Sequence, residues 1–255
     1  MSTKLKFAAA VAAAVLLSAC SSPKHEPMPL VSFTPSLEVT EVWSKGLSSA
    51  EGFLVPAVYD DMVFAAGGST LTRLNARAGE TEWSVSFDSP ITGGVGSDGY
   101  VTAVGLWDGN LEVVDAGGKV SWEKKLTTEL ASPPVVSHGL VIARTMDTRV
   151  SAFEASSGEL QWTYQKSQPA LTVRLPTRML AHDNFLLVGQ PNGHIVILDI
   201  ASGKPVFEFQ VAQAKGVTEV ERLVDVVGAP AFSENLVCAA AFQGAITCQD
   251  STNEH

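Results

Sequence analysis

Short apolar runs, each interrupted by a turn, recur along most of the chain. Leu140–Glu154 and Phe185–Asp199 each contain two β-rich runs that flank a turn. Asp108-Gly109 and Asn192-Gly193 are dipeptides typical of hairpin turns. Helical periodicity is absent, while glycine, valine and threonine are frequent. The pattern therefore predicts an all-β protein built from antiparallel hairpins.

Each apolar unit ends in a phrase of glycine, three variable residues and an aromatic residue. The aromatic positions are Trp83, Trp122, Trp162 and Phe207, and Trp43 precedes them. Successive tryptophans are 40, 39 and 40 residues apart. Four short strands in about forty residues are typical of a β-propeller blade, whereas a helical solenoid would need helical periodicity. We predict a β-propeller of four-stranded antiparallel blades, in which these aromatic residues are structural and wedge the last strand of one blade against its neighbour.

The N-terminus has the organisation of a lipoprotein signal peptide. Lys4 and Lys6 give it a positive start, and the apolar run Phe7–Leu17 has eleven residues, too few to span a membrane comfortably. Leu-Ser-Ala-Cys follows and ends at Cys20, which resembles a bacterial lipobox. An ordinary secretory signal with a chance cysteine is the alternative. We expect residues 1–19 to be removed and Cys20 to carry lipid.

A tether follows this cysteine. Residues 20–36 contain four prolines among polar residues, which predicts an extended segment. Ser21 stands directly after the cysteine, and by resemblance to bacterial lipoproteins the absence of aspartate there permits transfer to the outer membrane. No later stretch reaches eighteen apolar residues, so a lipid would be the only membrane anchor. Residues 37–255 are predicted to form a partial β-propeller.

Charge and chemistry exclude several functions. The chain has 27 acidic and 17 basic residues, and its net charge of −10 becomes −12 when two lysines leave with the signal peptide. This acidity argues against nucleic acid as a partner. The three cysteines and five histidines show no metal-ligand spacing, and no nucleotide-binding or hydrolase phrase is present. We therefore expect no metal, no cofactor and no enzymatic activity.

The repeat phrase, with its apolar-acid pair ahead of the glycine, resembles the quinoprotein-like propeller repeat. With the lipobox in front, the chain resembles the BamB family of the outer-membrane β-barrel assembly machinery. The resemblance implies a non-catalytic scaffold lipoprotein of the outer membrane, facing the periplasm, that assists folding and insertion of outer-membrane proteins. It implies the central barrel subunit of the machinery as a partner, and nascent outer-membrane proteins as possible further partners. The alternatives are another periplasmic propeller lipoprotein that binds a ligand or partner, and the remnant of a quinone-cofactor dehydrogenase.

Two segments resemble those by which this family docks on the central barrel subunit. The first docking segment is Pro169–Arg174, and the second docking segment is Gly216–Val226. The residues implied to bind the partner are Leu171, Val173, Arg174, Glu219, Arg222 and Asp225. Val173 replaces an expected leucine, and Val227 stands where a second acid is expected. The alternative is that Arg174 and Asp225 pair only with each other or with solvent.

Cys238 and Cys248 are placed symmetrically about residue 243, so they could face each other across a hairpin. Directly opposed β-residues lie within disulfide range, and an exported protein meets an oxidising compartment. Two small core residues with free thiols are the other interpretation. The wider, hydrogen-bonded register suits a disulfide poorly, which favours the free thiols slightly.

The number of repeats departs from the family pattern. The family ring has eight blades, which at about forty residues each need about 320 residues. Four repeat phrases occur here, and a fifth unit runs to Asp250 and is followed by Ser-Thr-Asn-Glu-His. We predict four to five blades of an expected eight, and a frameshifted or fragmentary reading frame as the cause. Open blade faces at both ends would then favour aggregation and proteolysis.

Overall fold

The computed structural model describes residues 30–48, 54–167, 169–173, 175 and 177–250. It divides into two units, Met1–Glu41 and Val42–His255. The described part of the first unit, residues 30–41, contains no helix or strand. The signal peptide, Cys20 and Arg174 lie outside the described residues.

Within the second unit, the described strands form five antiparallel sheets, each ordered as the chain runs. The first two sheets are β1 (Ala57–Tyr59), β2 (Met62–Gly67), β3 (Thr70–Asn75), β4 (Thr81–Ser86), and β5 (Ile91–Ser97), β6 (Val101–Leu106), β7 (Asn110–Asp115), β8 (Val120–Lys125). The next two are β9 (Val135–Ser137), β10 (Leu140–Arg144), β11 (Val150–Glu154), β12 (Leu160–Tyr164), and β13 (Leu180–His182), β14 (Phe185–Gly189), β15 (His194–Asp199), β16 (Pro205–Gln210). The fifth consists of β17 (Val226–Ser233), β18 (Leu236–Ala241) and β19 (Ile246–Asp250).

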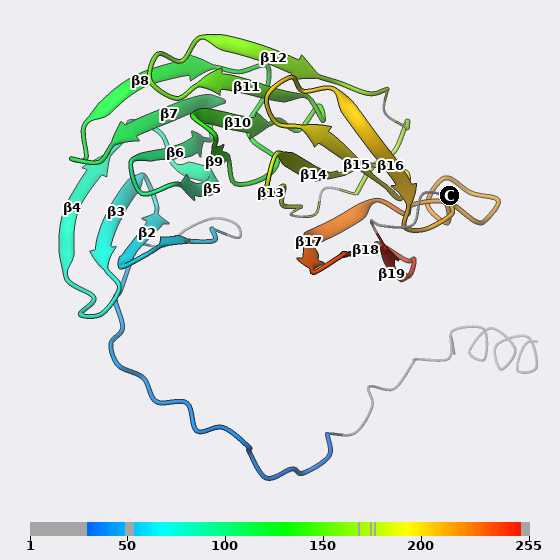
Figure 1. Cartoon of the computed structure of the whole chain (residues 1–255), viewed down its shortest axis with the longest axis horizontal. Coiled ribbons are helices and arrows are strands. Elements are labelled where there is room, and N and C mark those ends of the chain that lie inside the picture. Colours follow the sequence, from blue (N-terminus) through cyan, green and yellow to red (C-terminus); the bar gives the residue numbers. More distant parts are fainter. Residues whose placement is uncertain (1–29, 49–53, 168, 174, 176, 251–255) are drawn as a thin grey trace, which may run out of the picture. The chain divides into compact units, whose positions relative to one another are not determined.

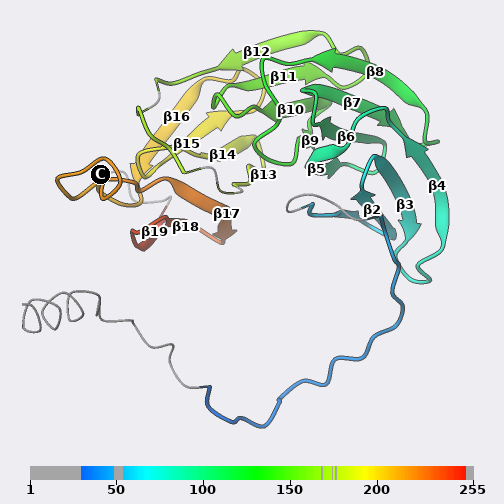
Figure 2. The same cartoon turned by 180° about the vertical axis from the view of Figure 1, so that it is seen from behind.

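These sheets are the blades of a partial β-propeller. They follow one another along an arc, from β2–β4 through β12 to β17 (Figure 1), and the view from behind shows the same succession (Figure 2). The first strands of neighbouring sheets contact each other, as β5 does with β1 and β9, and β17 does with β13. The fourth strands β4, β8, β12 and β16 are the outer edges of their sheets. The predicted fold class is therefore confirmed.

The predicted turns occur where the sequence placed them. Asn192 and Gly193, between β14 and β15, have φ values of 71° and 78°. Gly109, between β6 and β7, has a φ of 83°. Glycine and asparagine tolerate this left-handed region better than other residues do, so these dipeptides allow the chain to reverse tightly.

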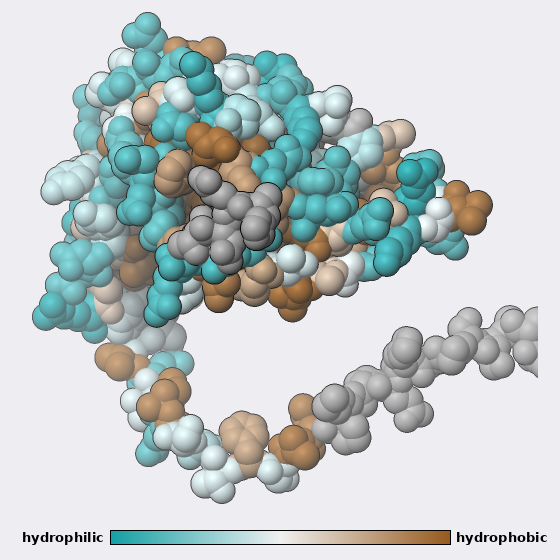
Figure 3. All heavy atoms as spheres, turned by 45° about the vertical axis from the view of Figure 1, so that its right-hand side comes forward, coloured by the Kyte–Doolittle hydropathy of each residue, from teal (hydrophilic) through white to brown (hydrophobic). Residues whose placement is uncertain are grey.

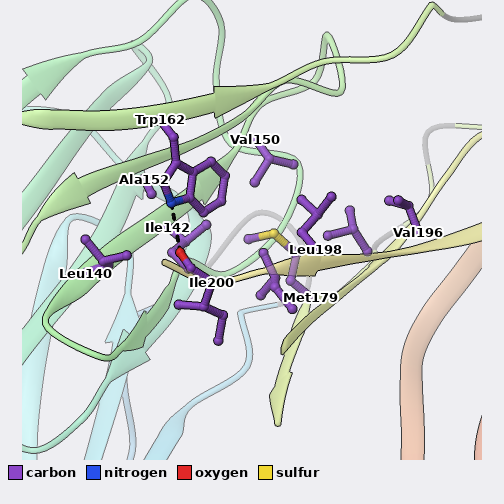
Figure 4. Packing of buried hydrophobic residues seen from close by; sticks show 11 residues of the cluster. Leu140, Ile142, Val150, Ala152, Trp162, Met179, Val196, Leu198 and Ile200 are labelled. Atoms are coloured by element: carbon purple, nitrogen blue, oxygen red, sulfur yellow. Dashed lines mark hydrogen bonds between the residues drawn. The ribbon is translucent and has the colours of Figure 1, made fainter. Parts of the chain in front are cut away.

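The apolar core lies between successive sheets rather than within one sheet. In one cluster, Leu140, Ile142, Val150 and Ala152 of the third sheet pack with residues of the fourth, including Leu198. Figure 4 shows these side chains converging from the two sheets, with Trp162 above them. Each blade therefore buries its faces only when its neighbours are present.

Three tryptophans of the repeat, Trp83, Trp122 and Trp162, each join their own blade to the next, and Trp43 makes the same contact from the segment before the first blade. The Trp162 indole donates a hydrogen bond from Nε1 to the carbonyl oxygen of Ile200 at 2.8 Å, drawn as a dashed line in Figure 4. The same ring lies against Gly203, where an added Cβ would be 2.4 Å from ring atoms. Only glycine fits beneath the indole, which explains the glycine of the repeat phrase. The corresponding pairs are Trp43 with Gly79, Trp83 with Gly118, and Trp122 with Gly158.

Two parts of the repeat differ from its regular pattern. The segment Leu37–Lys45, which includes Trp43, contains no strand. A strand needs a hydrogen-bonded neighbour, and no described strand pairs with this segment. Phe207 is 40% exposed on β16, and among the described glycines of the chain none lies against its ring as Gly203 lies against Trp162.

The fifth sheet carries a disulfide between Cys238 on β18 and Cys248 on β19. The two residues are direct register partners, and their Cα atoms are 4.0 Å apart. The slight preference for free thiols was wrong, because it assumed the wider register. Ala241 and Ala245 form the hydrogen-bonded pair at the turn, so alternation places the cysteines in the closer, non-hydrogen-bonded register.

Candidate docking site

The two docking segments meet through one buried carboxylate. Asp225 is 5% exposed. Its Oδ2 accepts a hydrogen bond from the backbone N–H of Val173 at 2.6 Å, and its Oδ1 accepts one from the N–H of Asn192 at 3.4 Å. The structure therefore brings Val173 and Asp225 together, but as a backbone-to-carboxylate contact within the protein and not as two exposed partner-binding side chains.

Residues of both segments line a shared pocket of about 300 Å³. Ala170 and Leu171 contribute from the first docking segment, and Glu219, Arg222 and Asp225 from the second. The connection before β13 supplies the first segment, and the connection between β16 and β17 supplies the second. Loops at the end of a propeller blade tolerate more sequence variation than the packed sheets do, and they are therefore suited to recognition.

A hydrogen-bonded turn at residues 219–222 shapes the second docking segment. The Thr218 hydroxyl accepts a hydrogen bond from the Glu221 N–H at 3.3 Å, and Glu221 Oε2 accepts one from the Thr218 N–H at 3.0 Å. This reciprocal pair is a capping box. Hydrogen bonds from the Thr218 and Val217 backbones lower the pKa of Glu221. The Glu221 carboxylate therefore stabilises the turn. Glu219 and Arg222 form an exposed ion pair at 4.0 Å.

Apolar side chains stand exposed beside these polar groups. Leu171 and Leu175 are each 41% exposed, Val220 is 59% exposed and Val217 is 95% exposed. On the face drawn in Figure 3, hydrophobic side chains lie in separate groups among hydrophilic ones. A polar surface with a few apolar anchors is typical of a non-obligate protein–protein interface.

A buried arginine beneath the first docking segment was missed by sequence reasoning. Arg144 ends β10 and is 3% exposed, and its Nη1 donates to the Thr177 hydroxyl at 2.7 Å. Burial lowers the pKa of Arg144 to about 10, although the charge of Asp225 opposes this shift. Arg144 and Asp225 line a second pocket of about 270 Å³ with Thr172 and Val173. In the sequence Arg144 only ends an ordinary apolar strand, so no local signal marks it.

Neither a metal-binding cluster nor a membrane-spanning helix occurs in the part of the chain that the structure describes. Among the described residues no group of three or more histidine, cysteine, aspartate or glutamate side chains is arranged to hold a metal ion. The described residues likewise include no helix long and apolar enough to cross a membrane. Of the six residues predicted to bind the partner, Leu171, Glu219, Arg222 and Asp225 line one pocket, Val173 contacts Asp225, and Arg174 is not described.

The fold and the repeat phrase define a propeller protein of the quinoprotein-like class. The crystal structure of quinohemoprotein alcohol dehydrogenase from Comamonas testosteroni covers 82% of this chain with a TM-score of 0.60, but at 18% identity it shows the fold alone. The sequence profile described as "Outer membrane protein assembly factor BamB" matches residues 67–255. The chain belongs to this BamB family.

Individual relatives agree with the profile. The outer membrane protein assembly factor BamB of Burkholderia pseudomallei is 38% identical over 251 residues, which cover 96% of this chain and 66% of the relative. The crystal structure of BamB from Moraxella catarrhalis matches with a TM-score of 0.72 and 28% identity, over 78% of this chain and 61% of that chain. The chain thus spans less than two thirds of the length of either relative.

Proposed function

We propose that this protein is a non-catalytic scaffold of the outer-membrane β-barrel assembly machinery, and that it docks on the central barrel subunit through the two docking segments. The names of its relatives, outer membrane protein assembly factors, support this proposal. Scaffolding would assist the folding and insertion of outer-membrane proteins without a cofactor.

The same proposal gives the protein a lipid anchor. Cys20 would carry the lipid, and residues 20–36 would tether the propeller to the outer membrane so that it faces the periplasm. The Leu-Ser-Ala-Cys phrase directly after an apolar run of eleven residues supports this assignment.

The observation that carries the docking proposal is the contact between the segments. Val173 and Asp225 are 52 residues apart in sequence, yet the Val173 N–H and the Asp225 carboxylate are hydrogen-bonded at 2.6 Å. Near this bond, the exposed Leu171 lines the same pocket as Glu219 and Arg222, which form an ion pair. An apolar anchor within a polar rim is the arrangement that concentrates binding energy in a few residues.

Capture of the periplasmic region of the central barrel subunit tests the proposal. Leu171→Ala combined with Arg174→Ala should weaken capture at least tenfold and leave the β-rich circular dichroism spectrum unchanged. Tyr100→Ala is a matched control, because Tyr100 is 74% exposed in the turn between β5 and β6 and lines neither docking pocket. A folded double variant with undiminished capture would remove these residues from the interface.

A further inference from the structure

Arg144 holds a positive charge where the described protein gives it little compensation. A guanidinium has five N–H donors. One donates to Thr177, and Nε is buried without a hydrogen-bond partner. Within the described residues no carboxylate oxygen lies within 4.0 Å of this guanidinium. A buried cation in this state is costly unless another group pairs with it.

The guanidinium borders a pocket that is open to a ligand. The pocket has a volume of about 270 Å³, and the threonines Thr145, Thr172 and Thr177 line it beside Arg144. Its apolar wall includes Ala170 and Leu175 of the exposed loop before β13. A water molecule occupies about 30 Å³ in the liquid, so the pocket can hold a side-chain carboxylate together with water.

Asp225 lies in the same pocket but does not neutralise Arg144 fully. Both of its carboxylate oxygens accept backbone hydrogen bonds, from Val173 and Asn192. The effect of burial on the Arg144 pKa exceeds the opposing effect of the Asp225 charge. A second anion would therefore stabilise the guanidinium, and a carboxylate matches its planar fork with two parallel hydrogen bonds.

We propose that Arg144 is the base of a binding site for a carboxylate group, presented by an acidic side chain of the docking partner. The source of the carboxylate rests on the proposed function, whereas the site itself does not. The Arg144 guanidinium would donate hydrogen bonds to the partner's carboxylate beneath the first docking segment. The exposed Leu171 and Leu175 would contact apolar surface of the partner around it.

Nuclear magnetic resonance of the Arg144 Nε–H in the full chain tests the site with small probes. The α-amide of N-acetylglutamate, whose single carboxylate is that of the side chain, should shift this resonance saturably at millimolar concentration, whereas the neutral α-amide of N-acetylglutamine should not. An equal response to both compounds would show a site for neutral acceptors and would overturn the carboxylate assignment.

Capture of the periplasmic region of the central barrel subunit provides the second measurement. Arg144→Lys should reduce capture at least tenfold, while Arg149→Lys, in the turn of the same β10–β11 hairpin and outside the pocket lining, should leave it unchanged. An unresponsive Arg144 resonance with intact capture by Arg144→Lys would overturn the carboxylate site and leave the proposed function standing. A saturable shift in a protein that captures no partner would support the site and refute the docking role.

Discussion

The carboxylate of Asp225 accepts a hydrogen bond from the backbone N–H of Val173 at 2.6 Å, and this contact joins the loop before β13 to the loop after β16. Because Asp225 is 5% exposed, it acts mainly by holding the first docking segment in place. A partner would meet the side chains that this bond positions rather than the carboxylate itself.

Replacing Asp225 should therefore loosen the loop before it affects the blades. Hydrogen bonds to a charged group contribute about 1.5–3 kcal/mol, so Asp225→Ala should destabilise the protein by about 2 kcal/mol. Asp225→Asn retains one acceptor oxygen and should cost less. Limited proteolysis should show faster cleavage between residues 168 and 176 in Asp225→Ala, with cleavage elsewhere unchanged. Uniformly faster cleavage would indicate a general loss of stability.

The tryptophan contacts between blades should dominate stability. Trp162→Ala removes a large buried side chain and should lower the free energy of unfolding by about 3–5 kcal/mol. Trp162→Phe should cost about 1 kcal/mol through the lost hydrogen bond to Ile200. Trp107 is 62% exposed, so Trp107→Ala is a control whose effect should stay within about 0.5 kcal/mol. Equal losses for Trp162→Ala and Trp107→Ala in thermal denaturation would contradict the assignment.

Glu112 should make stability depend on pH. It is 6% exposed on β7, opposite Glu123 on β8. Burial raises its pKa to about 7, and the charges of Glu123, Asp108 and Asp88 add to this effect. The native state keeps the proton that the unfolded state loses above about pH 4.5, so stability falls as pH rises from about 4.5 to 7.

Glu112→Gln should remove this pH-dependent loss. At pH 8 the variant should have a larger free energy of unfolding than the parent, by on the order of 1–3 kcal/mol, and therefore a higher unfolding temperature. At pH 4 the two proteins should unfold at nearly the same temperature. Glu159→Gln, at an exposed position, is the control. If the stability of Glu112→Gln changed between pH 4 and pH 8 as much as that of the parent, the role of the carboxyl group would be refuted.

The disulfide in the fifth sheet predicts a measurable redox dependence. Cys238 and Cys248 close a short loop, and such a link contributes about 2–3 kcal/mol. Cys238→Ala combined with Cys248→Ala should lose about this amount and become insensitive to reductant. Mass spectrometry of the non-reduced, denatured protein should find neither cysteine alkylated. Two alkylated cysteines would be incompatible with the bond.

Lipidation can be tested at Cys20. A palmitate analogue should label the wild-type protein in cells, and Cys20→Ala should abolish the label because the acylated thiol is gone. Ser22→Ala is the matched control, since it changes a nearby residue outside the lipobox and leaves the disulfide intact. Labelling of Cys20→Ala at the wild-type level would exclude the predicted anchor.

The repeat could be predicted from sequence because its signals are local. The glycine beneath each indole and the turn dipeptide Asn192-Gly193 each restrict a few neighbouring residues, so the pattern of strands follows directly. Arg144 and Asp225 give no such signal. Their burial depends on Thr177 and Val173, which lie 33 and 52 residues away in the chain, so it arises only when the loops fold over the sheets.

The tryptophan-to-glycine contacts also have a direction. Each indole reaches forward, from Trp43 to Gly79, from Trp83 to Gly118, from Trp122 to Gly158 and from Trp162 to Gly203. The glycine that each indole contacts belongs to the following repeat, so a chain that lacks this repeat also lacks the contact. Each repeat supplies the glycine for the preceding tryptophan and a new aromatic residue at its own end. The contact of each tryptophan is therefore complete only when the following repeat is present.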